Sequence, residues 1–203
     1  ASSMSASRPT ILLTGAGGQL GRELAAALAS CGTLLACDRR ALDLTDARAI
    51  ARVVRDASPQ FIVNAGGYTA VDRAETEREL AFAINGDAPG VLAAEALRAG
   101  AVLIHYSTDY VFDGTRDTPY DEDAPTNPVN AYGASKLAGE QAIARSGAAA
   151  LTLRTSWVYG RHGQNFLLTM QRLATQRDEI RVVADQRGAP NWTRALAAAT
   201  VEL

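Results

Sequence analysis

Short apolar runs alternate with longer, alanine-rich stretches of helical period along most of this chain. The apolar runs at residues 11–14, 34–37, 61–64, 102–107 and 151–154 have the length of buried strands. Between them, apolar side chains recur every three or four residues, as in the series Leu20, Leu24 and Leu28. Strands that alternate with helices form βαβ units, in which helices cover a parallel sheet. The pattern therefore predicts an α/β fold built on a doubly wound parallel sheet.

The composition indicates one principal globular domain and excludes several other classes of protein. The 203 residues are 47% hydrophobic and 21% charged, which suits a folded chain with a real core. Lys and Arg number 20 against 22 Asp and Glu, and the net charge of −2 comes with no basic stripe. That balance excludes a nucleic-acid or membrane-surface specialist. Since no apolar run approaches the ~20 residues of a membrane span, we expect a soluble, cytoplasmic protein.

Cysteine and histidine are too sparse to indicate a metal centre. Cys31 and Cys37 form no C-x-x-C pair, and His105 and His162 stand far apart in the sequence. We therefore expect reduced thiols and no zinc.

Capping residues mark where several helices begin and end. Asp46 suits the start of the helix that carries Ile50, and Ser58 followed by proline suits its end. Asp87, with Pro89 just inside, predicts the start of another helix, which Gly100 closes. Further on, the pattern predicts helices at 131–144 and 166–175, a short strand at 180–183 and a helix after Thr193. Residues 113–130 have loop composition, and a loop of that length in a compact domain is usually functional.

A glycine-rich segment, TGAGGQLG at residues 14–21, joins the first predicted strand to the first predicted helix. Glycines there allow a tight turn and a close approach of a pyrophosphate to backbone N–H groups, and the helix dipole favours the negative charge. A glycine turn that binds nothing is common, but the position between strand and helix favours a dinucleotide site. We expect this site to include Gly15, Gly18, Gln19, Leu20 and Gly21.

The residue that ends the second predicted strand bears on the choice of cofactor. Asp38 follows the first glycine at close to the ~20-residue spacing of an acid that binds the adenosine ribose. Such an acid favours NADH, whereas the neighbouring Arg39 and Arg40 could hold the 2′-phosphate of NADPH. The choice between the two nicotinamides stays open at this point.

Tyr132 and Lys136 are four residues apart on a predicted helix and so share one face. A nearby ammonium stabilises a phenolate, so we expect Lys136 to lower the pKa of Tyr132 toward the working range of an acid–base group. This spacing is common in solvated helices and indicates little alone. The hydroxyl and carboxylate groups of residues 107–110, at the carboxyl end of a predicted strand, add weight because ligands of open parallel sheets bind at that edge.

With these features together, the chain resembles the extended short-chain dehydrogenase/reductase superfamily. Longer strings narrow the likeness to the dTDP-4-dehydrorhamnose reductase family, from about Thr10 to the end of the chain. They are YTAVD at 68–72, STDYVFDG at 107–114, AYGASKLAGE at 131–140, RTSWVY at 154–159 and VADQ at 183–186.

The resemblance implies a Rossmann-type domain at residues 10–156 and an apparently truncated substrate-binding region at 157–203, after a disordered or cloning-derived tail at 1–9. It also implies reduction of a 4-keto nucleotide sugar, dTDP-4-dehydro-6-deoxy-L-mannose, by NADPH or NADH, and a possible homodimer. Thr108, Asp109, Tyr132 and Lys136 would be catalytic, and Lys136 would hold the nicotinamide ribose. Asp43, Leu44, Ala65, Gly66 and Gly67 would join the cofactor site, and Thr69, Val71, Tyr110, Trp157 and Asn165 the substrate site.

Some features depart from the family pattern. The loop after the third strand reads Asn64-Ala-Gly-Gly67, and Asn191 stands where the family has threonine. Family members continue beyond the position of Leu203, and the carboxylates that bind Mg²⁺ in some of them lie partly there, so a role for Mg²⁺ stays open. Two alternatives also stay open. One is a reductase of another nucleotide-linked keto-deoxysugar, and the other is a non-catalytic module like the regulatory β subunit of methionine adenosyltransferase.

Overall fold

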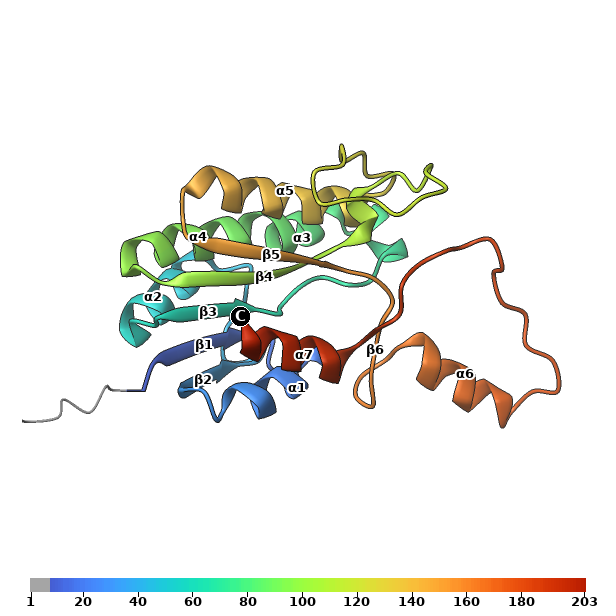
Figure 1. The fold of residues 1–203 in the computed structure, drawn as a ribbon, viewed down its shortest axis with the longest axis horizontal. Helices are drawn as coiled ribbons and strands as arrows, with labels where there is room; N and C mark the ends of the chain where they lie inside the picture. The colour runs from blue at the N-terminus through green and yellow to red at the C-terminus, as the bar shows by residue number, and fades with distance from the viewer. Residues whose placement is uncertain (1–7) are drawn as a thin grey trace, which may run out of the picture.

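The computed structural model describes residues 8–203. A five-stranded parallel sheet in the order β2-β1-β3-β4-β5 forms the centre of the molecule (Figure 1). The chain places β2 on one side of β1 and β3, β4 and β5 on the other, so the predicted doubly wound α/β fold is confirmed. The strands are β1 (Thr10–Thr14), β2 (Thr33–Cys37), β3 (Phe61–Asn64), β4 (Val102–Thr108) and β5 (Ala150–Thr155).

Helices cover both faces of this sheet. On one face lie α1 (Gln19–Leu28) and α7 (Thr193–Glu202), which pack against each other. On the other face lie α2 (Ala47–Ala57), α4 (Ala88–Ala99) and α5 (Ala131–Ser146), as Figure 1 shows. The sheet is therefore the middle layer of three.

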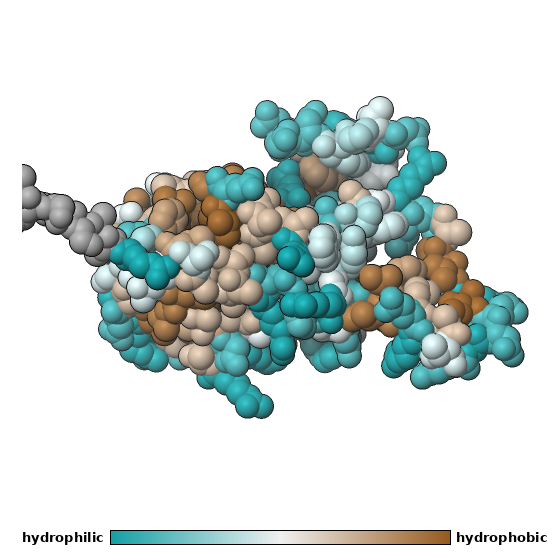
Figure 2. Space-filling model, turned by 60° about the horizontal axis from the view of Figure 1, so that its bottom comes forward, coloured by the Kyte–Doolittle hydropathy of each residue, from teal (hydrophilic) through white to brown (hydrophobic). Residues whose placement is uncertain are grey.

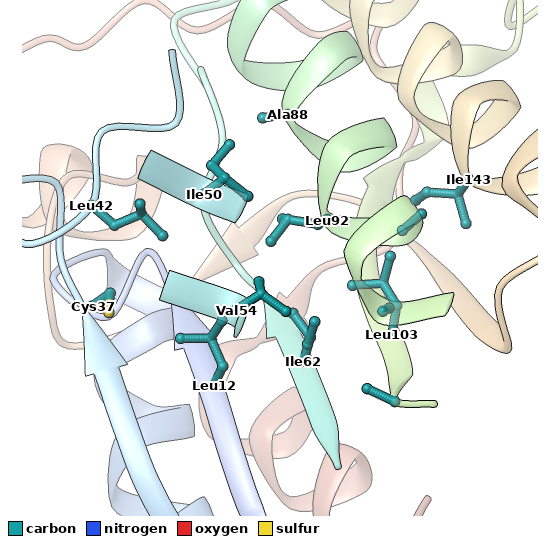
Figure 3. Close-up of a cluster of buried hydrophobic side chains, with 13 residues drawn as sticks. Leu12, Cys37, Leu42, Ile50, Val54, Ile62, Ala88, Leu92, Leu103 and Ile143 are labelled. Atoms are coloured by element: carbon teal, nitrogen blue, oxygen red, sulfur yellow. The ribbon is translucent and has the colours of Figure 1, made fainter. Parts of the chain in front are cut away.

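Side chains point alternately to the two faces of the sheet along each strand, so the core consists of one cluster on each face. Leu12, Ile62 and Leu103 are fully buried, register partners on neighbouring strands, and part of the cluster with α2 and α4. Figure 3 shows them facing Val54 of α2 and Leu92 of α4. The next residue on each strand, Leu13, Val63 or Ile104, belongs to the cluster with α1 and α7. Since full burial of one such side chain stabilises a fold by about 1.5–3 kcal/mol, these rows fix the register of the sheet.

Several predicted helix ends are confirmed. The Asp46 carboxylate accepts hydrogen bonds from the backbone N–H groups of Arg48 and Ala49 at the start of α2. Ser58 ends α2 in the left-handed conformation, and Gly100 ends α4 in the same way. These residues satisfy backbone groups that the helices leave unpaired.

The predicted helix boundary at Asp87 is where α4 begins, but the helical path itself starts earlier. A 3₁₀ turn, η1 (Asp72–Glu75), is followed by α3 (Arg78–Phe82) and a π-helical turn, η2 (Ala83–Asp87), which runs directly into α4. Asp87 has helical backbone angles and makes no capping bond. A proline inside a helix lacks an N–H group and crowds the carbonyl four residues earlier. The wider π turn before Pro89 lets the helix continue through it.

The region after β5 has less regular structure than the sequence predicts. It contains β6 (Val158–Tyr159), paired in parallel with β7 (Asn191–Trp192), and α6 (Phe166–Ala174). The predicted strand at 180–183 is wrong: these residues pair with no strand in the described part of the chain, and Val183 is 67% exposed. A β-prone run forms a strand only where a neighbouring strand can complete its hydrogen bonds.

Arg8 and Pro9, the last two residues of the predicted tail, make hydrogen bonds with the domain. Arg8 donates hydrogen bonds to the carbonyls of Ala29 and Ser30, and the Pro9 carbonyl accepts from the N–H of Thr33. Both therefore belong to the folded domain, while residues 1–7 lie outside the described part. Among the helices that are described, none combines the length and apolar character needed to cross a membrane.

Candidate active site

The glycine-rich loop lies at the point where the strand order reverses, between β1 and β3. Gly15 follows β1 with φ +69°, and a Cβ there would lie 2.5 Å from the backbone nitrogen of Gly66, in the segment after β3. Only glycine suits both the angle and the contact. Gly18 precedes α1, and no side chain caps the first N–H groups of that helix. A close-packed backbone loop beside a helix amino end fits a dinucleotide pyrophosphate.

The other residues assigned to the adenosine side gather next to this loop. The Cβ of Asp38 would lie 3.4 Å from a Cβ on Gly17, so the end of β2 borders the loop. Asp38 Oδ1 accepts from the N–H groups of Arg40 and Ala41, at 2.9 Å each, and these bonds lower the pKa of its carboxyl group. Leu44 packs against Gly66.

The segment after β3, with Ala65, Gly66 and Gly67, is fixed by a buried asparagine of the π turn. Asn85 accepts from the N–H of Tyr68 at 2.9 Å and donates to the Tyr68 carbonyl and to Ser135 Oγ at 3.0 Å. It thereby joins the loop after β3 to α5. Thr69 and Val71 follow in the same segment, Thr69 exposed and Val71 partly buried.

Thr108 and Asp109 lie at the carboxyl end of β4. Thr108 Oγ1 accepts from the N–H of Tyr110 and donates to Asp109 Oδ1, both at 3.2 Å. Ser156, just after β5, donates to Asp109 Oδ2 at 2.6 Å. The Asp109 carboxylate thus links the ends of two neighbouring strands and orients Thr108.

Tyr132 lies in the first turn of α5, next to these groups. Its ring meets that of Tyr110 edge-on, with 5.6 Å between centroids, and its hydroxyl lies near that of Thr108. A Cβ on Gly133 would lie 2.1 Å from the Tyr110 carbonyl oxygen, so glycine allows this close approach. Burial raises the pKa of Tyr132, as does the charge of Asp109, while the neighbouring Thr108 hydroxyl lowers it.

Lys136 lies one turn further along α5 and is buried. Its Nζ donates to the Tyr106 carbonyl at 2.6 Å and lies 3.4 Å from His105 Nε2. Burial lowers the pKa of Lys136 to about 8, opposed by the charge of Glu140. The expectation that Lys136 lowers the pKa of Tyr132 is wrong for this structure, because burial dominates and raises it.

Residues 157–165 lie across the start of α1 and include the last predicted substrate residues. Gln19 donates to the Val158 carbonyl at 3.2 Å and accepts from Asn165 Nδ2 at 3.3 Å. Asn165 also caps α6 by accepting from the N–H of Leu168. Trp157 has φ +42°, unusual for a bulky residue, and its side chain is half exposed. Polar and aromatic groups therefore border the glycine loop on this side too.

Comparison with known proteins shows which family has this arrangement. A family model described as the RmlD substrate binding domain matches residues 9–203. The chain belongs to the RmlD family.

Relatives of this RmlD-family chain include two dTDP-4-dehydrorhamnose reductases. The protein from Burkholderia thailandensis is 54% identical over 94% of the chain, and the one from Escherichia coli K12 is 47% identical over 94%. The chain covers 64% and 65% of their lengths, less than two thirds. A crystal structure of dTDP-4-dehydrorhamnose reductase from Bacillus anthracis, in complex with NADP, is 40% identical. It superimposes with a TM-score of 0.93, over 96% of this chain and 70% of that one.

Several polar residues of the RmlD-family site were not found from the sequence. Asn64, Asn85, His105 and Ser135 are buried and bonded within it. Asn64 and His105 could have been found, since a polar side chain late in a strongly apolar strand must find a buried partner. Asn85 and Ser135 lie in helices whose pattern signals nothing unusual. No group of three or more His, Cys, Asp or Glu residues suited to a metal ion occurs within residues 8–203.

Proposed function

We propose that this protein reduces the 4-keto group of dTDP-4-dehydro-6-deoxy-L-mannose to give dTDP-L-rhamnose, with NADPH as the reductant. The observation that carries this proposal is that the Thr108 and Tyr132 hydroxyls lie together at the carboxyl end of β4. The family membership and the named relatives support it. A non-catalytic role is not favoured, because a module that only binds has no need of this pair beside a buried lysine.

The chain's own groups suit reduction of a carbonyl. Thr108 would turn its single hydroxyl hydrogen from Asp109 to the carbonyl oxygen, and Tyr132 would protonate the alkoxide that forms. The raised pKa of Tyr132 keeps the phenol protonated at neutral pH, which is the state that a proton donor needs. Before substrate binds, Asp109, itself held by Ser156, would orient the Thr108 hydroxyl.

The residues around the glycine loop would hold the cofactor, whose reduced nicotinamide supplies the hydride. We assign the pyrophosphate to the loop and the start of α1, from Gly15 to Gly21, and the adenosine to Asp38, Arg39, Asp43 and Leu44. The nicotinamide half would lie along the segment after β3 and Lys136. Thr69, Val71, Tyr110, Trp157 and Asn165 are our candidates for the sugar nucleotide.

The direct test is to incubate the full protein with the keto-sugar nucleotide and NADPH and to follow the absorbance of the reduced nicotinamide. Consumption of NADPH that depends on the sugar, with one rhamnose nucleotide formed per NADPH, is the expected result. A folded protein that binds NADPH and leaves the sugar unchanged would contradict the proposal. Other nucleotide-linked keto-deoxysugars, assayed in parallel, identify a different substrate if there is one.

The preference between the cofactors rests on one exposed side chain. Arg39 lies beside Asp38, where a guanidinium could pair with a 2′-phosphate that only NADPH carries. We expect Arg39→Ala to weaken NADPH binding by up to about tenfold and to leave NADH binding nearly unchanged. Calorimetric titration with each nucleotide measures both effects, and equal losses would show that Arg39 does not read the phosphate.

A further inference from the structure

A row of buried polar side chains crosses the sheet from the glycine loop to the candidate catalytic lysine. Thr14, Asn64 and His105 are register partners on β1, β3 and β4, and each is at most 1% exposed. Two residues earlier on the same strands, the corresponding row is the apolar set of Leu12, Ile62 and Leu103. Since burying a polar group without a partner is unfavourable, a polar row at this depth calls for a specific role.

The row is continuously hydrogen-bonded. Thr14 Oγ1 donates to Asn64 Oδ1 at 2.6 Å, and Asn64 Nδ2 lies 3.0 Å from His105 Nδ1. On the other side of the ring, His105 Nε2 lies 3.4 Å from Lys136 Nζ. Four side chains thus connect the residue before Gly15 with the ammonium group of α5.

The imidazole in the middle of this row is neutral. Burial holds the pKa of His105 well below its usual value, and the charge of Lys136 acts in the same direction. A neutral imidazole has one N–H donor and one acceptor nitrogen. The two ring nitrogens of His105 must therefore play opposite roles toward Asn64 and Lys136.

Two complete hydrogen-bonding arrangements satisfy this condition. When Lys136 is an ammonium, it donates to Nε2, the ring proton is on Nδ1, and Asn64 must accept through its amide oxygen. When Lys136 is a neutral amine, Nε2–H donates to it, and Nδ1 accepts from the Asn64 amide nitrogen. Passing from the first arrangement to the second releases one proton to solvent and turns the Asn64 amide over, which reverses its hydrogen bond with Thr14.

The surrounding charges leave Lys136 close to the balance between these arrangements. The strands on either side of His105 present Asn64 and Thr152, both uncharged. On α5, Glu140 acts on Lys136 but is itself bonded to Ser107 and paired with Arg154. On α4, Glu95 is paired with Arg55 and Arg98, on the side facing α2. Since the pKa of Lys136 is about 8, both of its protonation states are populated near neutral pH.

We propose that His105 is a positioning residue whose tautomer follows the proton on Lys136 and which, through the Asn64 amide, couples that proton to Thr14 at the glycine loop. The coupling itself is a property of the buried row. Its consequence, that His105 fixes the position of the Lys136 ammonium during reduction, rests on the proposed function.

Nitrogen NMR of the imidazole tests the coupling without cofactor or substrate. The chain has two histidines, so His162→Gln leaves His105 as the single imidazole signal. In this ¹⁵N-labelled variant, we expect a neutral ring from pH ~6 to ~10 that changes from the Nδ1–H to the Nε2–H tautomer. The expected midpoint of that change is near the Lys136 pKa of about 8. The matched control adds Lys136→Met, which should abolish the transition.

A second variant fixes the hydrogen-bonding role of Asn64 within the row. In Asn64→Asp the carboxylate can only accept from Nδ1–H, so the Nδ1–H tautomer, and with it the charged lysine, should persist to higher pH. A constant tautomer in the His162→Gln protein, or the same transition after Lys136→Met, would overturn the proposal even if Asn64→Asp does not fold. Because these spectra need no turnover, the coupling can fail while the reductase assignment stands, and the reverse also holds.

Discussion

The two sides of the candidate site are built very differently. The side formed by β1, β3, β4 and α5 consists of buried, mutually bonded groups such as Asn64, His105 and Lys136. The other side, residues 157–190, contains β6, which pairs only with the two-residue strand β7 that follows this segment, and a helix, α6, without a buried residue. There Phe166 is 64% exposed, and Figure 2 shows apolar atoms gathered on the lobe that contains α6.

In the proposed function, the sheet side holds the groups assigned to chemistry, and residues 157–190 hold only two candidate substrate residues, Trp157 and Asn165. Groups on the sheet side are positioned by the same core that folds the domain, so their geometry is as stable as the fold itself. Residues 157–190 are attached mainly through β6, β7 and bonds such as that between Gln19 and Asn165. Segments with few buried contacts open locally at low free energy. We therefore expect changes on the sheet side to affect chemistry or global stability, and changes at 157–190 to act locally.

The largest expected effect is the loss of the proposed proton donor, Tyr132. Tyr132→Phe keeps the ring and its edge-on contact with Tyr110 but removes the hydroxyl. Turnover should fall by the ~10²- to 10⁴-fold typical of lost general acid catalysis, with unchanged circular dichroism and NADPH affinity. Steady-state kinetics with the keto-sugar nucleotide measures the loss.

Tyr159→Phe supplies the matched control, because it deletes the same atom from β6 on the other side of the site. We expect a much smaller effect on turnover than for Tyr132→Phe. Similar losses of turnover in the two variants would mean that the sheet side does not carry the proton transfer alone. Retained activity in Tyr132→Phe would require another proton donor.

The next effect concerns stability and has a defined pH dependence. The folded pKa of Lys136, about 8, is below the unfolded value near 10.5, so the folded state binds the proton less tightly than the unfolded chain. Stability of the folded state is therefore highest above pH ~10.5, where Lys136 is neutral in both states. It falls as the pH drops toward ~8, because the buried lysine resists taking up the proton that the unfolded chain binds. The full shift corresponds to about 3 kcal/mol.

Lys136→Met removes this proton linkage. Urea unfolding at several pH values should show the variant gaining on the parent protein as the pH falls from ~10 to ~8, with a constant difference below that. A pH-independent difference would show that Lys136 is not held in a low-dielectric site, and would remove the basis for the contrast in burial between the two sides.

Features that depend on local pattern were predicted from the sequence better than features that depend on contacts between distant segments. The strands, the glycine turn and the caps at Asp46 and Gly100 depend on local pattern and chain geometry, and the structure agrees with them. The strand at 180–183 was wrong because strand formation depends on a partner that local pattern does not reveal. Asn85 and the π turn were missed for a similar reason, since their role arises from contacts with Tyr68 and Ser135.

The raised pKa of Tyr132 has the same origin. Spacing on a helix correctly placed Lys136 on the same face as Tyr132, but the pKa of a phenol depends on what surrounds it in three dimensions. Burial and Asp109, which comes from β4 rather than α5, determine its direction. Local sequence thus predicts which groups meet more reliably than how they titrate.

The smallest effect compares two helix caps of the same kind, one on each side of the division. Asp46 caps α2, which packs on the sheet, and Asn165 caps α6, which has no buried residue. Loss of either cap by mutation to alanine should destabilise its helix by about 1 kcal/mol. For Asp46→Ala this loss should lower the global free energy of unfolding in urea, because α2 unfolds with the core. For Asn165→Ala global unfolding should be nearly unchanged, while hydrogen exchange in residues 166–174 becomes about fivefold faster, since α6 opens without the rest of the domain. If Asn165→Ala lowered global stability as much as Asp46→Ala, residues 157–190 would be part of the same cooperative unit as the sheet, and the division drawn between the two sides would not hold.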